Sequence, residues 1–113
     1  MMNDKELLEL AAKAAGFDAI IEMYGLNDIG EPLLDANDPP TVWNPLTDDG
    51  DALRLAVKLH INIEIWNVDT LIGANIYLRG RGHGYFQERY TTDPYAATRR
   101  AIVRAAAEIG KGE

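Results

Sequence analysis

The feature that most constrains the fold is a run of three short amphipathic segments in the second half of the chain. Residues 61–66 alternate isoleucine with polar or aromatic residues. Residues 74–79 likewise alternate aliphatic residues with polar or aromatic ones. A period of two is typical of a strand with one buried face. Residues 84–91 alternate less regularly but are rich in aromatic residues, which favours a third strand. The glycine-rich stretch 80–84 predicts a hairpin turn, so the three segments predict an antiparallel meander.

Two helices are predicted before this meander. Residues 3–15 carry leucine and alanine at helical spacing, and Gly16 is a natural stop. The second helix is predicted to begin at Thr47 or Asp48 and to reach about His60. Only a narrow polar stripe interrupts its apolar residues, so we expect this helix to be largely buried.

A third helix is predicted after the meander. Asp93 is a suitable N-cap, and Pro94 fits the first helical position because it has no backbone N–H to satisfy. We expect this helix to run to about Ile109 and to stop at Gly110, since glycine commonly ends a helix.

The remaining segments predict two further strands and a long loop. Residues 17–24 have the composition of a strand, with an extension of the preceding helix as the alternative for the first half of the segment. Residues 25–40 contain glycine, proline, asparagine and aspartate, and such a long loop is a candidate for a binding role. Residues 41–43 predict a short strand that ends where Asn44-Pro45 forces an extended or turn conformation.

Together these elements predict a single domain over residues 1–113. The expected fold class is α+β. We expect three helices packed on a mostly antiparallel sheet of four to five strands, in an arrangement like an α/β/α sandwich. This layout buries the apolar face of each helix against a sheet.

Composition narrows the chemistry that is available. The chain contains no cysteine and no serine, which excludes disulfides, thiolate metal sites and both cysteine and serine nucleophiles. The formal net charge of −7 disfavours binding to a nucleic-acid backbone, because that affinity comes largely from lysine and arginine. No apolar run is long enough to span a membrane, and the polar N-terminus is unlike a signal peptide. We therefore expect a protein of the bacterial cytoplasm that makes no contact with membranes.

The most unusual segment is Arg79-Gly80-Arg81-Gly82-His83-Gly84. Glycine lets a backbone approach a ligand closely, and arginine can hold a phosphate or carboxylate through two parallel hydrogen bonds. The segment is therefore a candidate binding site for a ligand or partner. The alternative is a solvated, mobile hairpin tip with no binding role.

Aromatic residues beside this segment extend the candidate site. Tyr77 and Tyr85 are placed to stack on a nucleotide base, and Arg99 is a further candidate if it lies near the turn. Trp66 and Tyr77 fall on the polar side of their predicted strands, so they are the better candidates for exposure or for burial beneath another helix. The alternative for these aromatic residues is that they belong to the core.

The other polar clusters predict structural roles. Asp48, Asp49 and Asp51 stand at a helix start, where acids are stabilised by free N–H groups, so we interpret them as a cap rather than a metal site. His60 ends a helix, where a structural role is favoured. A general base at His83 has no evident nucleophile beside it. We predict no catalytic residues, no metal and no cofactor.

Two blocks of sequence resemble a known family. They are WNPLTDDGDALRLAVKL at residues 43–59 and DPYAATRRAIVRAAAEIG at residues 93–110. Both are similar to segments of the phage ABA-sandwich domain family of small phage and prophage proteins. The resemblance implies a sheet that lies between helical layers and an origin in a phage or prophage. It brings no catalytic residues with it.

These observations lead to one functional hypothesis and two alternatives. We expect a non-enzymatic accessory protein of a phage or prophage that binds a host component, with counter-defence as the natural setting. The bound component would be a host protein or a nucleotide signal, and a homodimer would double the site. The alternatives are a structural or virion-associated phage protein and, third, a nucleotide-acting enzyme that uses His83.

Overall fold

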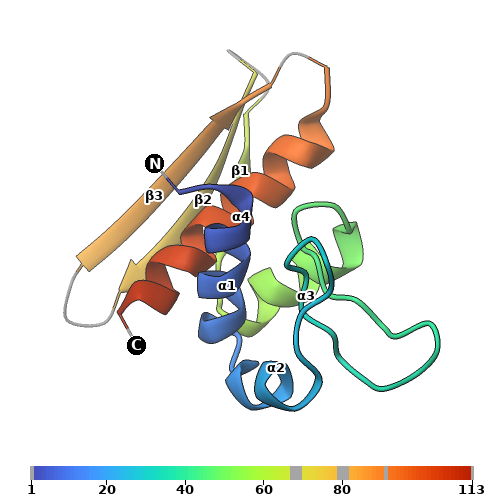
Figure 1. Cartoon of the computed structure of the whole chain (residues 1–113). Coiled ribbons are helices and arrows are strands. Elements are labelled where there is room, and N and C mark those ends of the chain that lie inside the picture. Colours follow the sequence, from blue (N-terminus) through green and yellow to red (C-terminus); the bar gives the residue numbers. More distant parts are fainter. Residues whose placement is uncertain (1, 67–69, 79–81, 91, 113) are drawn as a thin grey trace.

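The computed structural model describes residues 2–66, 70–78, 82–90 and 92–112. Over these residues the chain forms an α+β fold of four helices and one antiparallel sheet of three strands (Figure 1). The fold class is as predicted, but there is one helix more and at least one strand fewer than expected. The elements are α1 (Asp4–Ala14), α2 (Asp18–Tyr24), α3 (Asp49–Lys58), β1 (Asn62–Ile65), β2 (Leu71–Leu78), β3 (Gly82–Arg89) and α4 (Pro94–Lys111).

The additional helix is α2, in the segment that was predicted to be a strand, so that prediction is wrong. The backbone turns at Gly16, which has a φ of +81°, and a new helix begins after Phe17. Phe17 and Ile21 pack against the core, and their spacing of four residues puts them on one helical face. Phe17 also meets the buried Trp43 edge to face, with ring centroids 5.1 Å apart. Tertiary contacts at a four-residue interval thus favour the helix over the strand.

Residues 25–40 form a loop, as predicted, and the short strand predicted at residues 41–43 is not formed. Val42 instead forms an isolated β-bridge with Leu33, and a second isolated bridge joins Leu26 to Pro32 within the loop. The loop folds back on itself, so Val42 pairs with Leu33 alone. The residues on either side of Val42 have no such pairing, and no strand forms.

The predicted meander is confirmed. The strand order is β1-β2-β3, all antiparallel, and one rung of the sheet aligns Glu64 with Gly73 and Gly73 with Gln87. β3 begins earlier than predicted, at Gly82, which pairs with Leu78 of β2. β1 lies at an edge of this sheet.

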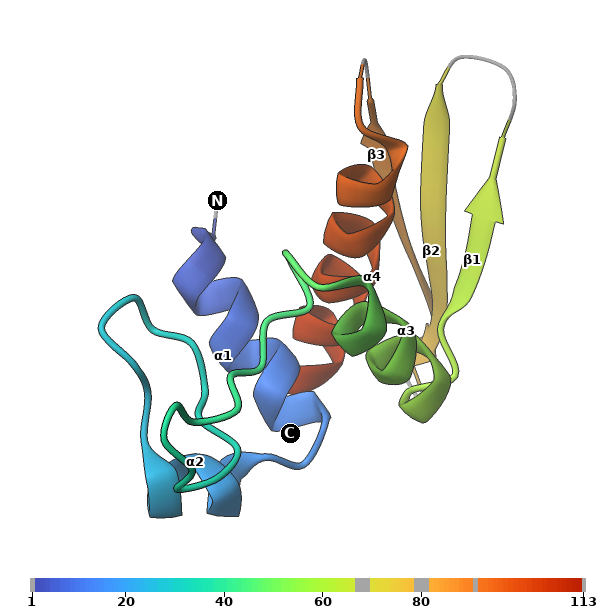
Figure 2. The ribbon, with the colours of Figure 1, turned by 90° about the vertical axis from the view of Figure 1, so that its right-hand side faces the viewer.

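The layers are ordered differently from the predicted α/β/α sandwich. α4 packs on β2 and β3, α3 packs beside α4, and α1 packs on α4. Figure 2 shows the sheet on one side, α3 and α4 next to it, and α1 beyond them. All the helices that the structure describes therefore lie on one side of the sheet. The reason is α4 itself, which has buried residues around its circumference and so forms a middle layer.

Gly110 does not end the last helix, contrary to the prediction. α4 continues to Lys111, and Gly110 is a buried position inside the helix. A Cβ atom at Gly110 would overlap the carbonyl oxygen of Leu10 in α1 and would lie 2.8 Å from the carbonyl carbon. Glycine is required here because the backbones of α1 and α4 touch.

α3 is less buried than its sequence predicted. Ala52, Leu55 and Ala56 are buried, whereas Leu53 and Val57 are 59% and 68% exposed. The apolar residues of α3 occupy two sides of the helix, and only one of them packs against α4 and the core.

His60 follows the end of α3 in an uncommon backbone conformation. After the C-cap Leu59, His60 adopts a φ of +56°. Its N–H donates to the Val57 carbonyl (3.3 Å), and the Ile61 N–H donates to the Ala56 carbonyl (2.9 Å). This pair of bonds is a Schellman motif, in which the position of His60 usually holds glycine.

We therefore expect His60→Gly to raise the free energy of unfolding by about 0.5 kcal/mol, because glycine adopts a positive φ without steric cost. His60→Val should lower it by about 1 kcal/mol, since a branched side chain is strained in this region. Urea denaturation with an unchanged m-value would measure both effects. A less stable glycine variant would contradict the expectation.

Candidate binding surface

The two faces of the sheet differ in character. On one face Ile63, Ala74 and Phe86 occupy a single rung and pack against the core beneath α4. Because side chains alternate along a strand, the neighbouring residues point away from the helices. That second face, which we call the open face, carries no helix among the described residues (Figure 2).

The centre of the open face is an aromatic cluster made of Glu64, Trp66 and Tyr85. The two rings lie with centroids 6.3 Å apart and planes tilted by 34°. Trp66 Nε1 donates to Glu64 Oε2 (3.2 Å), and the Tyr85 hydroxyl donates to the same oxygen (3.4 Å). Trp66 is 37% and Tyr85 40% exposed. One carboxylate therefore holds two large, partly exposed rings in place.

Gly73 explains how the Tyr85 ring lies against the sheet. A Cβ atom at Gly73 would be 2.7 Å from Tyr85 Cζ, so any side chain there would push the ring away. A glycine inside a strand often marks such a close approach. The sequence contained this signal, but neither Gly73 nor Glu64 was among the predicted site residues.

The predicted site residues are only partly placed by the structure. Tyr85 lies on the open face as described. Tyr77 and His83 are paired with each other in the β2–β3 ladder, beyond the pair formed by Asn75 and Tyr85. Their side chains are outside what the structure describes. The remaining two members of the predicted turn site, Arg79 and Arg81, lie outside the described residues.

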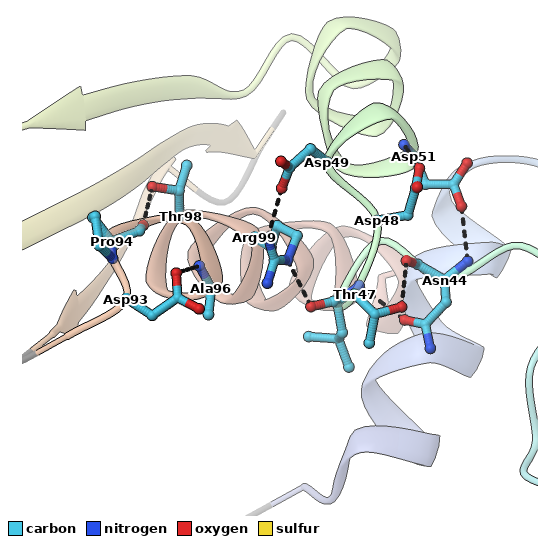
Figure 3. A network of polar contacts seen from close by, with 11 residues as sticks. Asn44, Thr47, Asp48, Asp49, Asp51, Asp93, Pro94, Ala96, Thr98 and Arg99 are labelled. Carbon is cyan, nitrogen blue, oxygen red and sulfur yellow. Dashed lines mark hydrogen bonds and ion pairs between the residues drawn. The ribbon is translucent and has the colours of Figure 1, made fainter.

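Arg99 does not join Tyr85 in one site. It lies on α4, on the helical side of the sheet, whereas Tyr85 is on the open face. Its Nε donates to the Leu46 carbonyl (2.8 Å), and its Nη1 pairs with Asp49 Oδ1 (2.6 Å) (Figure 3). The side chain is only 16% exposed. Arg99 thus fixes the start of α3 to α4, and the sequence could not show this because the partners are about 50 residues away in the chain.

The acidic run at the start of α3 forms a cap, as predicted. Asp48 Oδ2 accepts the N–H of Asp51 (2.8 Å). Asp51 has a further role that the sequence did not reveal: it is 8% exposed and accepts from the Asn44 N–H (3.0 Å) and from Arg54 Nη2 (2.7 Å). Figure 3 shows Asn44 and Asp51 facing each other between the loop and α3. This carboxylate joins the long loop to the helix.

The same polar network continues into the long loop. The Glu31 carboxylate accepts from Asn27 Nδ2 (2.7 Å) and from Asn44 Nδ2 (2.6 Å). Asn27 Oδ1 in turn accepts the backbone N–H groups of Ile29 (3.2 Å) and Glu31 (2.8 Å). The loop is therefore held by its own side chains, and these polar groups already have protein partners.

Asp35 organises the tip of this loop. The side chain and the backbone N–H of Thr41 hydrogen-bond to its carboxylate, and together they lower the pKa of Asp35 below its ordinary value. The backbone N–H groups of Asn37 and Thr41 each lie 3.0 Å from Asp35 Oδ1. The residue acts as a turn former within the loop.

Fold and surface together define an α+β protein with a one-sided antiparallel sheet and an aromatic cluster on the open face. Comparisons of the chain with protein-family models, with curated proteins and with solved structures found no match. Within the described ranges, no helix has both the length and the apolar character needed to cross a membrane.

Proposed function

We propose that this is a non-enzymatic binding protein that recognises a partner protein through the open face of its sheet. The observation that carries the proposal is the aromatic cluster, in which Trp66 and Tyr85 stand partly exposed and are both oriented by Glu64. Tryptophan and tyrosine are enriched among the residues that dominate interface energies. Their rings are already held in one arrangement, so binding would cost little side-chain entropy.

The charge of the chain supports a basic partner. The formal net charge is −7, and opposite charges steer association and suppress unsuitable partners. The resemblance of residues 43–59 and 93–110 to phage ABA-sandwich proteins supports a phage or prophage accessory role. In this proposal the partner is a component of the bacterial host cytoplasm, and counter-defence is the setting.

A nucleotide signal is the weaker form of the proposal. Arg99 was the basic residue expected to join the stacking tyrosines, and it is engaged by Leu46 and Asp49 on the other side of the sheet. The nucleotide form would then depend on Arg79, Arg81 and His83 together with Tyr77 or Tyr85. A partner protein requires only the cluster that the structure describes.

The experiment is affinity capture from bacterial host lysate, followed by native mass spectrometry of the eluted protein. We expect the double variant Trp66→Ala/Tyr85→Ala to lose the captured partner, with affinity reduced by at least about 30-fold, because hot-spot truncations commonly cost about 2 kcal/mol or more. Tyr24→Ala is the matched control, since Tyr24 is 36% exposed and lies on α2.

Gly73→Ala provides a second variant that keeps both rings but displaces that of Tyr85. We expect it to weaken capture as well, while circular dichroism shows a folded protein. Equal capture by the wild type and both cluster variants would overturn the proposed surface. If native mass spectrometry detects a bound mass equal to that of a nucleotide, and Tyr85→Ala loses this mass, the ligand is a nucleotide and not a partner protein.

A further inference from the structure

The outer edge of β1 has backbone groups available for pairing. The Trp66 N–H donates to the Leu71 carbonyl of β2 (3.1 Å). Because backbone groups alternate in direction along an antiparallel strand, Ile63 and Ile65 direct their N–H and C=O groups away from β2. No strand in the described part of the chain pairs with this edge. β1 is short, with 4 residues, and carries one charged side chain, Glu64, but it has no lysine, proline or bulge of the kind that commonly protects a free edge.

Exposed apolar side chains lie beside this edge. Leu53, Ile65 and Tyr95 line one groove of about 540 Å³ between α3, β1 and the start of α4. Val57 lies one turn further along α3 from Leu53. These four residues, which we call the apolar patch, are 59%, 71%, 69% and 68% exposed in the order named.

We infer that the β1 edge and the apolar patch form the interface of a homodimer, in which the two sheets join through β1 into one six-stranded sheet. An antiparallel pair of identical strands is related by a two-fold axis perpendicular to the sheet, so the edge is complementary to itself. The same axis brings the two apolar patches together on the helical side. A second copy therefore pairs with the free edge of β1 and covers the patch at once.

The exposed area of the apolar patch is consistent with a second copy of the chain as its partner. Four apolar side chains exposed to this extent present roughly 500 Å² per copy, near the upper end of the apolar patches found on monomeric proteins. Two such patches together with the paired strand edges bury roughly 1,000–1,200 Å² in total, which is the size of a small interface of modest affinity.

Charge does not oppose the contact, although the chain as a whole is acidic. Among the described residues that line the groove, Asp49 is the one carboxylate, and it is paired with Arg99. Repulsion between acids elsewhere on the two copies is screened over about 8–10 Å at physiological salt. The patch is thus a region where the acidic surface is locally neutralised.

The position of the axis follows from Glu64 and from the backbone hydrogen bond of Ile61. If Ile63 faced Ile65 of the second copy, the two Glu64 side chains would stand directly opposite each other, which is destabilising for like charges. If Ile65 faces the partner's Ile65, Glu64 stands opposite the partner's Trp66 and no like charges meet. An axis at Ile63 would also keep the two Glu64 side chains apart, but it would place Ile65 opposite Ile61, whose N–H already donates to the Ala56 carbonyl (2.9 Å). We therefore place Ile65 on the two-fold axis, which also joins the two open faces into one surface.

The first test is sedimentation velocity over a range of concentrations up to about 100 μM, since dimerisation follows mass action. We expect the wild type to sediment as a dimer and Ile65→Lys to weaken dimerisation by at least about tenfold, because it places two like charges on the axis. Ile29→Lys is the matched control, since Ile29 is 74% exposed and lies in the long loop. It should dimerise like the wild type.

The second test uses the absence of cysteine from the chain. Under oxidation Ile65→Cys should form a covalent dimer, because paired residues in an antiparallel ladder have Cα atoms about 5.5 Å apart, within reach of a disulfide. Ile29→Cys should not cross-link. A wild type that stays monomeric throughout, or a dimer that neither Ile65 variant affects, would overturn the inference. Neither test requires a host partner, so the outcome is independent of the proposed function.

Discussion

Gly110→Ala is expected to lower the free energy of unfolding by about 3 kcal/mol, the typical upper range for overpacking a tight core contact. The new Cβ atom would overlap the Leu10 carbonyl group; the α4 backbone fixes the position of the Cβ atom, and the carbonyl group belongs to the backbone of α1. No side-chain rotation can relieve the overlap, so α1 and α4 must move apart. In a chain of 113 residues this corresponds to a fall in melting temperature of roughly 10 °C.

Gly112→Ala is the matched control for this prediction. Gly112 is the exposed C-cap of the same helix and has a φ of −82°, so alanine fits its conformation. We expect its stability to remain within about 0.5 kcal/mol of the wild type. Helix propensity alone would make Gly110→Ala more stable by about 1 kcal/mol. Thermal denaturation that showed such a gain would contradict the close packing of α1 on α4.

Asp51→Ala is expected to have the second largest effect, a loss of about 2–3 kcal/mol in the free energy of unfolding. The substitution leaves the partly buried N–H of Asn44 without its acceptor, and an unsatisfied donor costs up to about 1–3 kcal/mol when it is buried. It also removes the charge-assisted bond from Arg54 and a negative charge in the first turn of α3. The long loop would lose its attachment to the helix.

Chemical denaturation measures this loss, and limited proteolysis locates it. We expect cleavage within residues 25–43 to accelerate in Asp51→Ala, because the loop would open more often. Asp49→Ala is the control: it removes an acid from the same turn, but Asp49 is 71% exposed and its ion pair with Arg99 should contribute no more than about 1 kcal/mol. Equal stability of the two variants would show that the burial of Asp51 is not the cause of the lost stability.

The candidate site was predictable only where it depends on strand register. Alternation placed Trp66 on the polar side of its strand, and its partial exposure agrees with that prediction. The grouping of Arg99 with the tyrosines failed because a single sequence does not say which side of a sheet a distant helix will cover. The role of Gly73 depends on a ring from the neighbouring strand, so it becomes evident only once β2 and β3 are paired.

Local chemistry determined several elements from the sequence alone. Asn3, Asp48 and Asp93 cap their helices through hydrogen bonds to residues three positions ahead, and such bonds depend only on nearby residues. The antiparallel meander could be predicted from the alternation of apolar and polar residues and from the short segments between the strands. Tertiary structure decided the rest. It made residues 18–24 a helix through the contacts of Phe17 and Ile21, and it converted Gly110 from a presumed stop into a contact between helices. It also put every described helix on one side of the sheet, because α4 could be buried on all sides only as a middle layer.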